Sequence, residues 1–364
     1  MKLQVTQENL SKALSNVARI ADSRGTLPIL ANALIKTVDN RLSITTTNLD
    51  IAITQFIGSK INEEGSVTLP ARLMQDFVGS LPAGVINLEL DDHKLRIKTD
   101  QYDSTVNGTA ADEFPVMPTI SGGQEWRVPT ETFKTALQQV IFAASSDDAR
   151  PVLTGVYLYD FEGALYAAAT DSYRLAEKRI LSKNAPTGKL LIPASALQDL
   201  LRVLGDAGGD VQVTHDDQQV QFRVDDIELV ARLIEGKYPE YRKLIPSEFA
   251  TTATLPKDEL LNITKVSSLF ARESAGSVTI NVDEESQTVS IHSIASQLGE
   301  NTATAKAMVS GTGQITVNSR YLLEALHACQ GEEVSFCFNG KLEPSLLKDS
   351  SDTDYVHVIM PLKS

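Results

Sequence analysis

The interpretation of the sequence depends on one ten-residue stretch, Ala167–Ala176, which reads AAATDSYRLA. Its small residues begin as a strand, although a core strand would normally continue in β-branched residues. The strand stops instead at a polar and aromatic turn, which gathers Thr170, Asp171, Tyr173, Arg174 and Leu175. Taken alone, this pattern is typical of an edge strand with a solvated turn. Three distant segments change that interpretation when they are read with it: Arg150–Gly155 (RPVLTG), Tyr238–Pro246 (YPEYRKLIP) and Val358–Ser364 (VIMPLKS).

The stretch belongs to an internal repeat with a period of about 120 residues. Residues of the first third recur 123 positions later, among them Pro28 and Pro151, Thr47 and Thr170, and Pro70 and Pro193. A third copy is looser, with shifts of 122 to 127 positions. This period is too long for a solenoid unit and predicts three related domains, which we place at residues 1–119, 120–247 and 248–364.

Each copy follows one plan of two helices and several strands. Apolar residues at helical spacing predict a first helix at 7–22, 130–145 and 256–271. The apolar positions are Leu10, Leu14, Val17 and Ala21 in the first copy, and Leu260, Ile263, Val266 and Phe270 in the third. A second helix, after a proline or an Asn-Ser cap, is predicted over 70–81, 193–204 and 318–328. The sequence therefore predicts an α+β fold of three topologically similar domains, each with two helices packed on antiparallel sheets.

The composition is that of a chain with a packed core and an acidic surface. The chain has 364 residues, 42% of them apolar, and 33 basic against 47 acidic side chains give a net charge of −14. This balance argues against a simple basic groove for nucleic acid but allows a local basic surface. The six predicted helices carry eight basic and eight acidic residues, so the acidic excess lies outside them. Helices that face a polyanion would explain this distribution, and so would acids that merely solvate sheets and loops.

Targeting signals and disulfides are not expected. The N-terminal residues Met1–Gln7 lack the apolar core of a signal peptide, and no apolar run approaches transmembrane length. Cys329 and Cys337 form neither a disulfide framework nor a zinc site. We therefore expect a soluble, cytoplasmic protein with two buried thiols.

Recognisable catalytic patterns are missing from the sequence. The five histidines are not spaced with another His, Cys or acid as a metal site requires, and no phosphate-binding glycine loop or Gly-x-Ser-x-Gly elbow occurs. Asp147-Asp148 is more typical of a turn, and Asp171 has no nucleophile or histidine near it in sequence. We expect no catalytic residue, no metal and no cofactor. Three functions stay open: a scaffold that grips a polymer and partners, an unrecognised hydrolase using Asp171, and a self-assembling structural protein.

Four motifs in register resemble the bacterial DNA polymerase III β subunit, the sliding clamp family, from Met1 to Ser364. They are Ala-Thr-Asp-x-x-Arg-Leu-Ala at 169–176 and the three segments quoted above. The resemblance implies that two protomers close head-to-tail into a ring, with helices lining a hole that encircles double-stranded DNA. It also implies a non-catalytic processivity factor of the DNA polymerase III holoenzyme. Such a clamp tethers the replicative polymerase, is placed on DNA by a clamp loader, and binds other replication and repair proteins.

The resemblance further implies three sets of binding residues. A pocket for an extended apolar partner peptide ending in Leu-Phe is carried over to Leu153, Gly155, Thr170, Tyr173, Arg174, Leu175, Pro239, Leu244, Asn318, Tyr321, Pro344, Met360, Pro361 and Leu362. Contacts to DNA are carried over to Arg24, Arg72, Arg150 and Arg202. The dimer interface is carried over to Ser104 and Val106 on one protomer and Leu269 and Phe270 on the other. Two departures affect the pocket: Ser172-Tyr173 replaces the Gly-His of many members, and the C-terminal Leu362–Ser364 is variant.

Overall fold

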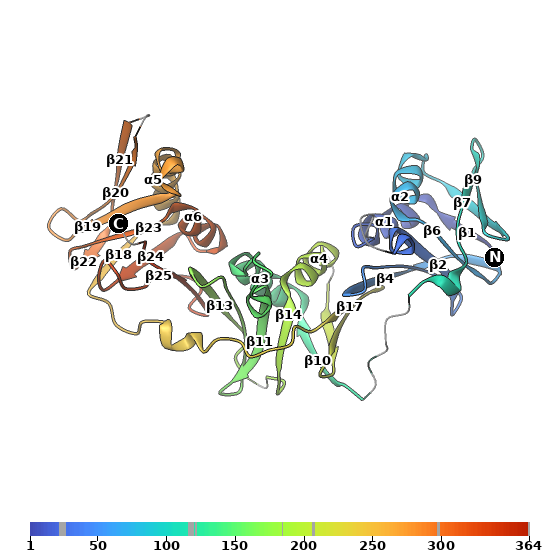
Figure 1. Ribbon diagram of the computed structural model, residues 1–364, viewed down its shortest axis with the longest axis horizontal. Coiled ribbons are helices and arrows are strands. Elements are labelled where there is room, and N and C mark those ends of the chain that lie inside the picture. The colour runs from blue at the N-terminus through green and yellow to red at the C-terminus, as the bar shows by residue number, and fades with distance from the viewer. Residues whose placement is uncertain are drawn as a thin grey trace. The chain divides into compact units, whose positions relative to one another are not determined.

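The computed structural model describes residues 1–21, 27–115, 120, 122–183, 185–205, 208–296 and 299–362 (Figure 1). The chain divides into two compact units. The first comprises Met1–Glu131 and Ala196–Leu233, and the second comprises Thr132–Ser195 and Ile234–Ser364. Each unit contains two antiparallel sheets and the helices that cover them, so the predicted mixture of helices and antiparallel sheets is confirmed.

The first unit holds a five-stranded and an eight-stranded sheet. The smaller sheet has the order β5-β1-β7-β8-β9, with β1 (Lys2–Thr6), β5 (Lys60–Glu63), β7 (Val85–Asp91), β8 (Lys94–Lys98) and β9 (Asp103–Asn107). The larger has the order β10-β15-β16-β17-β4-β3-β2-β6, with β2 (Asn32–Val38), β3 (Arg41–Thr47), β4 (Ile51–Gly58), β6 (Ser66–Pro70), β10 (Gln124–Pro129), β15 (Asp210–His215), β16 (Gln219–Val224) and β17 (Ile227–Arg232). Its helices are α1 (Gln7–Val17), α2 (Ala71–Ser80) and, from Ala196 on, α4 (Ala194–Leu204), with short 3-10 turns at Pro28–Ala31 and Ala111–Glu113.

The second unit holds a nine-stranded and a four-stranded sheet. The larger has the order β14-β11-β12-β13-β26-β25-β24-β18-β22, with β11 (Gly155–Phe161), β12 (Ala164–Thr170), β13 (Arg174–Leu181), β14 (Lys189–Pro193), β18 (Thr251–Pro256), β22 (Met308–Ser310), β24 (Glu333–Phe338), β25 (Ser345–Asp349) and β26 (Tyr355–Ile359). The smaller has the order β21-β20-β19-β23, with β19 (Ser277–Asp283), β20 (Thr288–Ala295), β21 (Gly299–Lys306) and β23 (Gly313–Asn318). Its helices are α3 (Thr130–Val140, from Thr132 on), α5 (Lys257–Phe270) and α6 (Ser319–Ala328), and its 3-10 turns are η3 (Ile141–Ala143), η4 (Pro151–Leu153), η5 (Tyr241–Leu244) and η6 (Arg272–Ser274).

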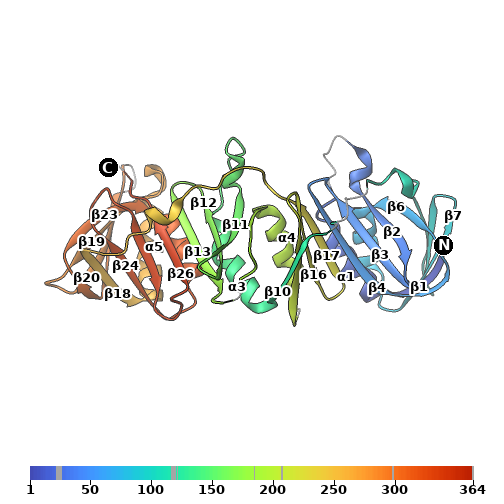
Figure 2. The ribbon, with the colours of Figure 1, turned by 90° about the horizontal axis from the view of Figure 1, so that it is seen from below.

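The large sheets join strands that are distant in sequence. In the first unit β17 pairs with β4, from Ile227 opposite Gln55 to Ala231 opposite Ile51. In the second unit β13 pairs with β26, from Arg174 opposite Ile359 to Lys178 opposite Tyr355 (Figure 2). Each of these junctions connects two successive copies of the sequence repeat through an unbroken backbone ladder.

The helices begin within one residue of the predicted positions, but two of them end five residues earlier than predicted. The side chain of Thr6 caps α1, and Asn318 caps α6 by accepting a hydrogen bond from the Arg320 N–H at 2.9 Å. The prediction of a helix over 7–22 is too long, because α1 ends at Val17. The prediction over 130–145 is too long as well, because α3 ends at Val140 and continues as η3.

Helix α1 buries the predicted apolar face, whereas α5 does not. Leu10, Leu14 and Val17 are fully buried. On α5 the buried residues are Leu260, Thr264 and Ser267, and the helix packs against β20 and β21 on that side. The predicted core position Val266 is 46% exposed, and Leu269 is 50% exposed. The buried face of α5 therefore carries Thr264 and Ser267 beside Leu260, whereas Val266 and Leu269 face outward.

No helix in the described part of the chain is long and apolar enough to cross a membrane.

Candidate functional site

The turn between β12 and β13 is closed by its own side chains. The Thr170 hydroxyl donates to the carbonyl oxygen of Arg174 at 2.6 Å and accepts from the Ser172 N–H at 3.1 Å. Asp171 Oδ1 accepts from the backbone N–H groups of Tyr173 and Arg174 at 2.9 and 3.0 Å. Asp171 is therefore engaged as the cap of a tight turn, a role that side chains of this type commonly serve.

Ser172 has a left-handed backbone in this turn. Its φ is +79°, a region that glycine enters without strain and other residues enter at a cost. The Ser172 hydroxyl also accepts a hydrogen bond from Arg150 at 3.0 Å, which a glycine could not accept.

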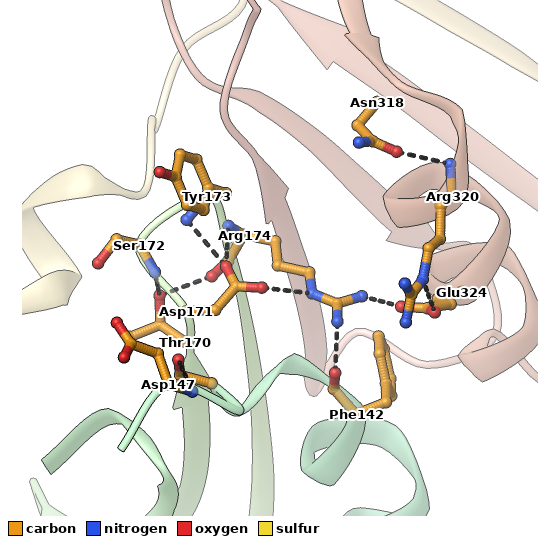
Figure 3. A network of polar contacts seen from close by, with 11 residues as sticks. Phe142, Asp147, Thr170, Asp171, Ser172, Tyr173, Arg174, Asn318, Arg320 and Glu324 are labelled. Atoms are coloured by element: carbon orange, nitrogen blue, oxygen red, sulfur yellow. Dashed lines mark hydrogen bonds and ion pairs between the residues drawn. The ribbon is translucent and has the colours of Figure 1, made fainter. Parts of the chain in front are cut away.

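The guanidinium of Arg174 points into the protein and not toward the solvent (Figure 3). Its Nε donates to Asp171 Oδ2 at 3.1 Å, its Nη2 donates to the Phe142 carbonyl oxygen at 2.6 Å, and its Nη1 pairs with the Glu324 carboxylate. The same guanidinium lies 4.6 Å from the ring centre of Tyr321 and 5.4 Å from that of Phe142. Arg174 therefore ties the turn to η3 and to α6, and each of its three side-chain nitrogens donates to a partner within the fold.

Glu324 completes this network from α6. It accepts from Arg174 and also from Arg320 Nε at 2.8 Å, one helical turn away. Burial acts to raise the pKa of Glu324, but the hydrogen bonds from Arg320 and Arg174 outweigh it and the pKa is lowered. Glu324 is thus held as a carboxylate beside a buried guanidinium. Sequence reasoning missed Glu324 and Phe142; the signal was the i, i+4 pair of Arg320 and Glu324 on the predicted helix.

The end of β26 and the residues after it run past the same turn. The Met360 N–H donates to the Tyr173 carbonyl oxygen at 2.9 Å, and the Leu362 N–H donates to the Thr316 carbonyl oxygen at 2.8 Å. Met360, Pro361 and Leu362 are half-buried. The last two positions of the variant C-terminus, 363 and 364, lie outside the described residues.

The segment Arg150–Gly155 borders the turn on another side. Leu153 is buried in η4, and Arg150 is bonded to both Ser172 and Asp147. At Gly155 an added Cβ would lie 2.8 Å from Ile234 and 2.9 Å from the Ile192 carbonyl oxygen, so a larger residue would not fit. The structure thus brings Arg150, which the sequence predicts for DNA, to the predicted partner pocket.

The two faces of β13 have different surroundings, because successive side chains of a strand point to opposite faces. Arg174 and Lys178 lie on one face, where Lys178 pairs with Asp352 at 2.5 Å. We call the other side the Leu175 face. There Leu175, 4% exposed, packs in an apolar cluster with Val358 and Tyr241. Leu175 is therefore part of the protein core as well as a neighbour of the turn.

Several of the predicted pocket residues stay in contact with solvent. Tyr173 and Leu244 are more than half exposed, and Pro239 is exposed as well. Asn318, Tyr321 and Pro344 are half-buried. All fourteen predicted pocket residues lie in the second unit. Exposed apolar side chains beside a rigid, hydrogen-bonded turn suit an extended apolar peptide better than a small polar substrate.

The other predicted residues that the structure describes lie on other elements of the fold. Arg72 is exposed on α2, and Arg202 pairs with Asp199 on α4. Arg24 lies outside the described residues. Ser104 and Val106 lie on β9, the last strand of its sheet, and Leu269 and Phe270 lie at the end of α5.

Family models match the chain in three consecutive parts. The N-terminal domain of the DNA polymerase III beta subunit matches residues 1–118, its central domain matches 127–240, and its C-terminal domain matches 242–363. Together they cover nearly the whole chain in the order of the family.

Curated relatives and solved structures agree with this match. The chain is 30% identical to the beta sliding clamp of Synechocystis, with 100% of this chain and 99% of the relative covered, and 29% identical to that of Bacillus subtilis, with both chains fully covered. The crystal structure of the Bacillus subtilis DNA polymerase sliding clamp superimposes with a TM-score of 0.94 at 28% identity, covering 100% of this chain and 99% of that one. The DnaN sliding clamp of Pseudomonas aeruginosa superimposes with a TM-score of 0.95 at 23% identity over the full length of both chains.

Proposed function

The chain belongs to the DNA polymerase III beta subunit family, the sliding clamps of DNA replication, and we propose that two copies of it close into a ring around duplex DNA and present the Thr170–Arg174 turn to partner proteins. A sliding clamp is a processivity factor without catalysis of its own, and it works with DNA and a polymerase. The observation that carries the proposal is the match of the three family domains, in order, to the three copies of the sequence repeat. A site on DNA also implies action in the cytoplasm.

The hydrolase alternative is not favoured. Both oxygens of Asp171 already accept hydrogen bonds within the turn and from Arg174. A general base needs a lone pair directed at a substrate proton. The geometry gives Asp171 a structural task, and the family similarity accounts for the whole chain without an enzyme activity.

We divide the chain into three clamp domains at residues 1–119, 120–247 and 248–364. The matched family domains support these boundaries, since each match begins and ends within seven residues of them. The domains are connected through the β4–β17 and β13–β26 ladders, so neighbouring domains share a continuous sheet.

The proposed partner site takes an extended apolar peptide with a leucine or phenylalanine anchor. Four segments that are distant in sequence support it: the Thr170–Leu175 turn, Leu153 and Gly155, Pro239 and Leu244, and Met360–Leu362. Direct hydrogen bonds connect the turn with Met360 and with Arg150. Its occupants would include the replicative polymerase, the clamp loader and other proteins of replication and repair that carry such a peptide.

The proposed dimer interface joins the β9 edge of one protomer, at Ser104 and Val106, with Leu269 and Phe270 of α5 on the other. β9 ends its sheet, and an edge strand presents unpaired backbone groups that a second chain can bond. The exposed apolar side chains of Val266 and Leu269 on α5 support the same assignment. A head-to-tail interface of this kind, used twice, closes a ring.

Light scattering across a dilution series tests the ring. Phe270→Asp would bury an unpaired charge in the interface and should reduce the molar mass to that of one chain. The matched control is Met308→Asp, at an apolar position that is exposed elsewhere in the same unit and should leave the dimer intact. A Phe270→Asp protein that keeps the dimer mass at micromolar concentration would show that the interface lies elsewhere.

The proposed DNA contacts are Arg24, Arg72, Arg150 and Arg202. Their direct contribution to affinity is small, because few phosphates are neutralised and a chain of net charge −14 repels DNA. Retention is therefore topological. A ring loaded on nicked circular DNA should stay bound and should slide off once the circle is cut, and equal retention on both forms would contradict encirclement.

A further inference from the structure

We infer that Glu177 and Arg242 form a positioning pair that holds the segment Tyr238–Leu244 as one wall of the partner site. The inference rests on the proposed function, because Pro239 and Leu244 of this segment are assigned to the site. We call Tyr238–Leu244 the linker segment, since it leads from the β17 strand toward β18 of the next repeat.

The linker segment alternates anchored and exposed residues. Tyr238 and Tyr241 are buried in the apolar cluster of the Leu175 face, whereas Pro239 and Leu244 face solvent. The Tyr238 ring stacks on Tyr157 of β11 at 4.8 Å between ring centres. The buried tyrosines thus fix the segment on the sheet, and the residues between and after them are the ones offered to a ligand.

A buried acid on the sheet receives the polar groups of this segment. Glu177 lies on the Leu175 face of β13 and is 8% exposed. Its carboxylate accepts from the Tyr159 hydroxyl at 2.8 Å and from the Tyr241 hydroxyl, and it pairs with Arg242 at 3.3 Å. Burial, and next the charge of Glu177, raise the pKa of Tyr159 and of Tyr241, so both phenols remain protonated donors.

Arg242 is held by rings as well as by the acid. Its Nε donates to the Tyr159 hydroxyl at 2.7 Å, and its guanidinium carbon lies 4.0 Å from the ring centre of Phe161 and 4.3 Å from that of Tyr166. Such contacts of a cation with aromatic faces strengthen as the site loses water. Arg242 therefore has its position fixed two residues before Leu244.

The other charged residues in and beside the linker segment cannot take over the role of the Glu177–Arg242 pair. Glu240 pairs with Lys237 and Lys243, but all three side chains are mostly exposed. Exposed pairs of this kind contribute little. In the Glu177–Arg242 pair the Glu177 side chain is 10% exposed and that of Arg242 is 33% exposed. Removing Glu177 leaves the charge of Arg242 and the hydroxyls of Tyr159 and Tyr241 without this acceptor. Loss of Glu177 should therefore displace the linker segment, and Leu244 with it, while the sheet beneath stays paired.

The probe is a labelled Gln-x-x-Leu-Phe peptide, an example of the extended peptide ending in Leu-Phe that the family resemblance implies. Its binding to the full chain is measured by fluorescence anisotropy. We expect Glu177→Gln to weaken binding about tenfold, and the matched control Glu240→Gln to bind like the wild type. A double-mutant cycle with Leu244→Ala separates positioning from a general loss of structure. If Glu177 acts through Leu244, Glu177→Gln should weaken peptide binding by less than about twofold when Leu244 is already replaced by alanine.

A second variant keeps the test decisive if Glu177→Gln fails to fold. Tyr241→Phe preserves packing and removes one donor, and it should show a smaller loss with the same dependence on Leu244. The inference about Glu177 and Arg242 would be overturned if Glu177→Gln lowered peptide affinity equally with and without Leu244→Ala. It would also be overturned if a folded Glu177→Gln protein bound the peptide with unchanged affinity. Neither result would contradict the partner site itself. A wild-type chain that does not bind the peptide would instead overturn the partner site itself, and the inference with it.

Discussion

Two turns 123 residues apart in the chain have the same hydrogen bonds and different side chains. At Thr47–Ile51, between β3 and β4, the Thr47 hydroxyl bonds the Ile51 carbonyl and the Leu49 N–H, and Asn48 Oδ1 accepts from the N–H groups of Asp50 and Ile51. At the second turn, between β12 and β13, Thr170 and Asp171 form the corresponding four bonds. Leu49 and Ser172 even share a positive φ, of +80° and +79°. The turn is thus a feature of the repeated fold.

What distinguishes the second turn is therefore the set of side chains placed on it. Where the first unit has Ile51, Ala52 and Leu229, the second has Arg174, Leu175 and His357 at equivalent register positions. In the first junction Arg41 pairs with Asp226, which directly precedes β17, and the two side chains are 37% and 56% exposed. In the second junction Arg174 and Lys178 are buried, and their partners Asp171 and Asp352 are only 14% and 15% exposed. The same backbone supports a plain connection in one unit and a candidate binding site in the other.

The largest expected effect comes from replacing Arg174 with isoleucine, the residue that the first turn has at the equivalent position, Ile51. Arg174→Ile would leave Asp171 and Glu324 without their buried partner, a loss of about 3–5 kcal/mol in the free energy of unfolding. Urea unfolding followed by fluorescence or circular dichroism measures it. Arg41→Met removes the exposed pair of the first junction and should cost about 1 kcal/mol or less. Equal costs at the two arginines would contradict the contrast between the junctions.

A second conversion separates core residues from ligand-facing residues of the site. Leu175→Ala reproduces Ala52 and should destabilise the protein by about 2–5 kcal/mol, because it deletes buried methyl groups. Leu244→Ala, at a side chain that is 53% exposed, should change stability by about 0.5 kcal/mol or less but weaken peptide binding. Thermal unfolding and peptide titration of both variants check this. Similar melting temperatures for the two would mean that Leu175 is not core.

His357 should make the second junction sensitive to acid. Burial, and then the charge of Arg174, lower the pKa of His357 to about 3 in the folded protein. The unfolded chain takes up this proton below its ordinary pKa of about 6.5. The contribution of His357 to stability is therefore complete above that pH and is lost as the pH falls toward 3.

Because one proton is taken up on unfolding, the free energy of unfolding should fall by about 2 kcal/mol between pH 7 and pH 5. His357→Leu, the residue of the first junction, should remove this part of the pH dependence. The measurement is urea unfolding of both proteins at several pH values, and the difference between them isolates His357 from the carboxylates. A difference that stays constant with pH would contradict the assignment.

The smallest expected effect concerns backbone strain in the turn. Ser172→Gly should relieve the left-handed conformation and stabilise the protein by about 0.5–1 kcal/mol, less the lost bond from Arg150. Leu49→Gly should behave similarly in the first unit, because its φ is the same. Chemical denaturation of the two variants compares them. A destabilisation beyond about 1 kcal/mol at Ser172 would show that the serine hydroxyl matters more than the backbone.

The sequence predicted the turn and its repetition because short-range signals define them. Thr170 and Asp171 form local hydrogen bonds, and the recurrence of Thr47 at Thr170 marks the same turn. The buried face of α1 could be predicted for the same reason. The direction of Arg174 could not, because its acid Glu324 lies 150 residues later and meets it only after β13 has paired with β26.

Helix α5 shows a different limit of prediction from sequence. A helical pattern of apolar residues identifies a face that avoids water, but it cannot distinguish a face covered by the chain's own sheet from one covered by a second chain. Leu260 lies against the sheet, whereas Val266 and Leu269 are exposed. Likewise, Glu177 is an acid at an inward strand position, and its partners Tyr159 and Arg242 become neighbours only in the folded unit.

Hydrogen exchange of the full chain with and without a Gln-x-x-Leu-Phe peptide compares the two turns most directly. We expect slower exchange at Thr170–Leu175, in the linker segment and at Met360–Leu362. We expect no change at Thr47–Ala52, where the backbone is the same and the site residues are missing. Equal protection at both turns, or protection at neither while the peptide is bound, would contradict the placement of the partner site at the second turn.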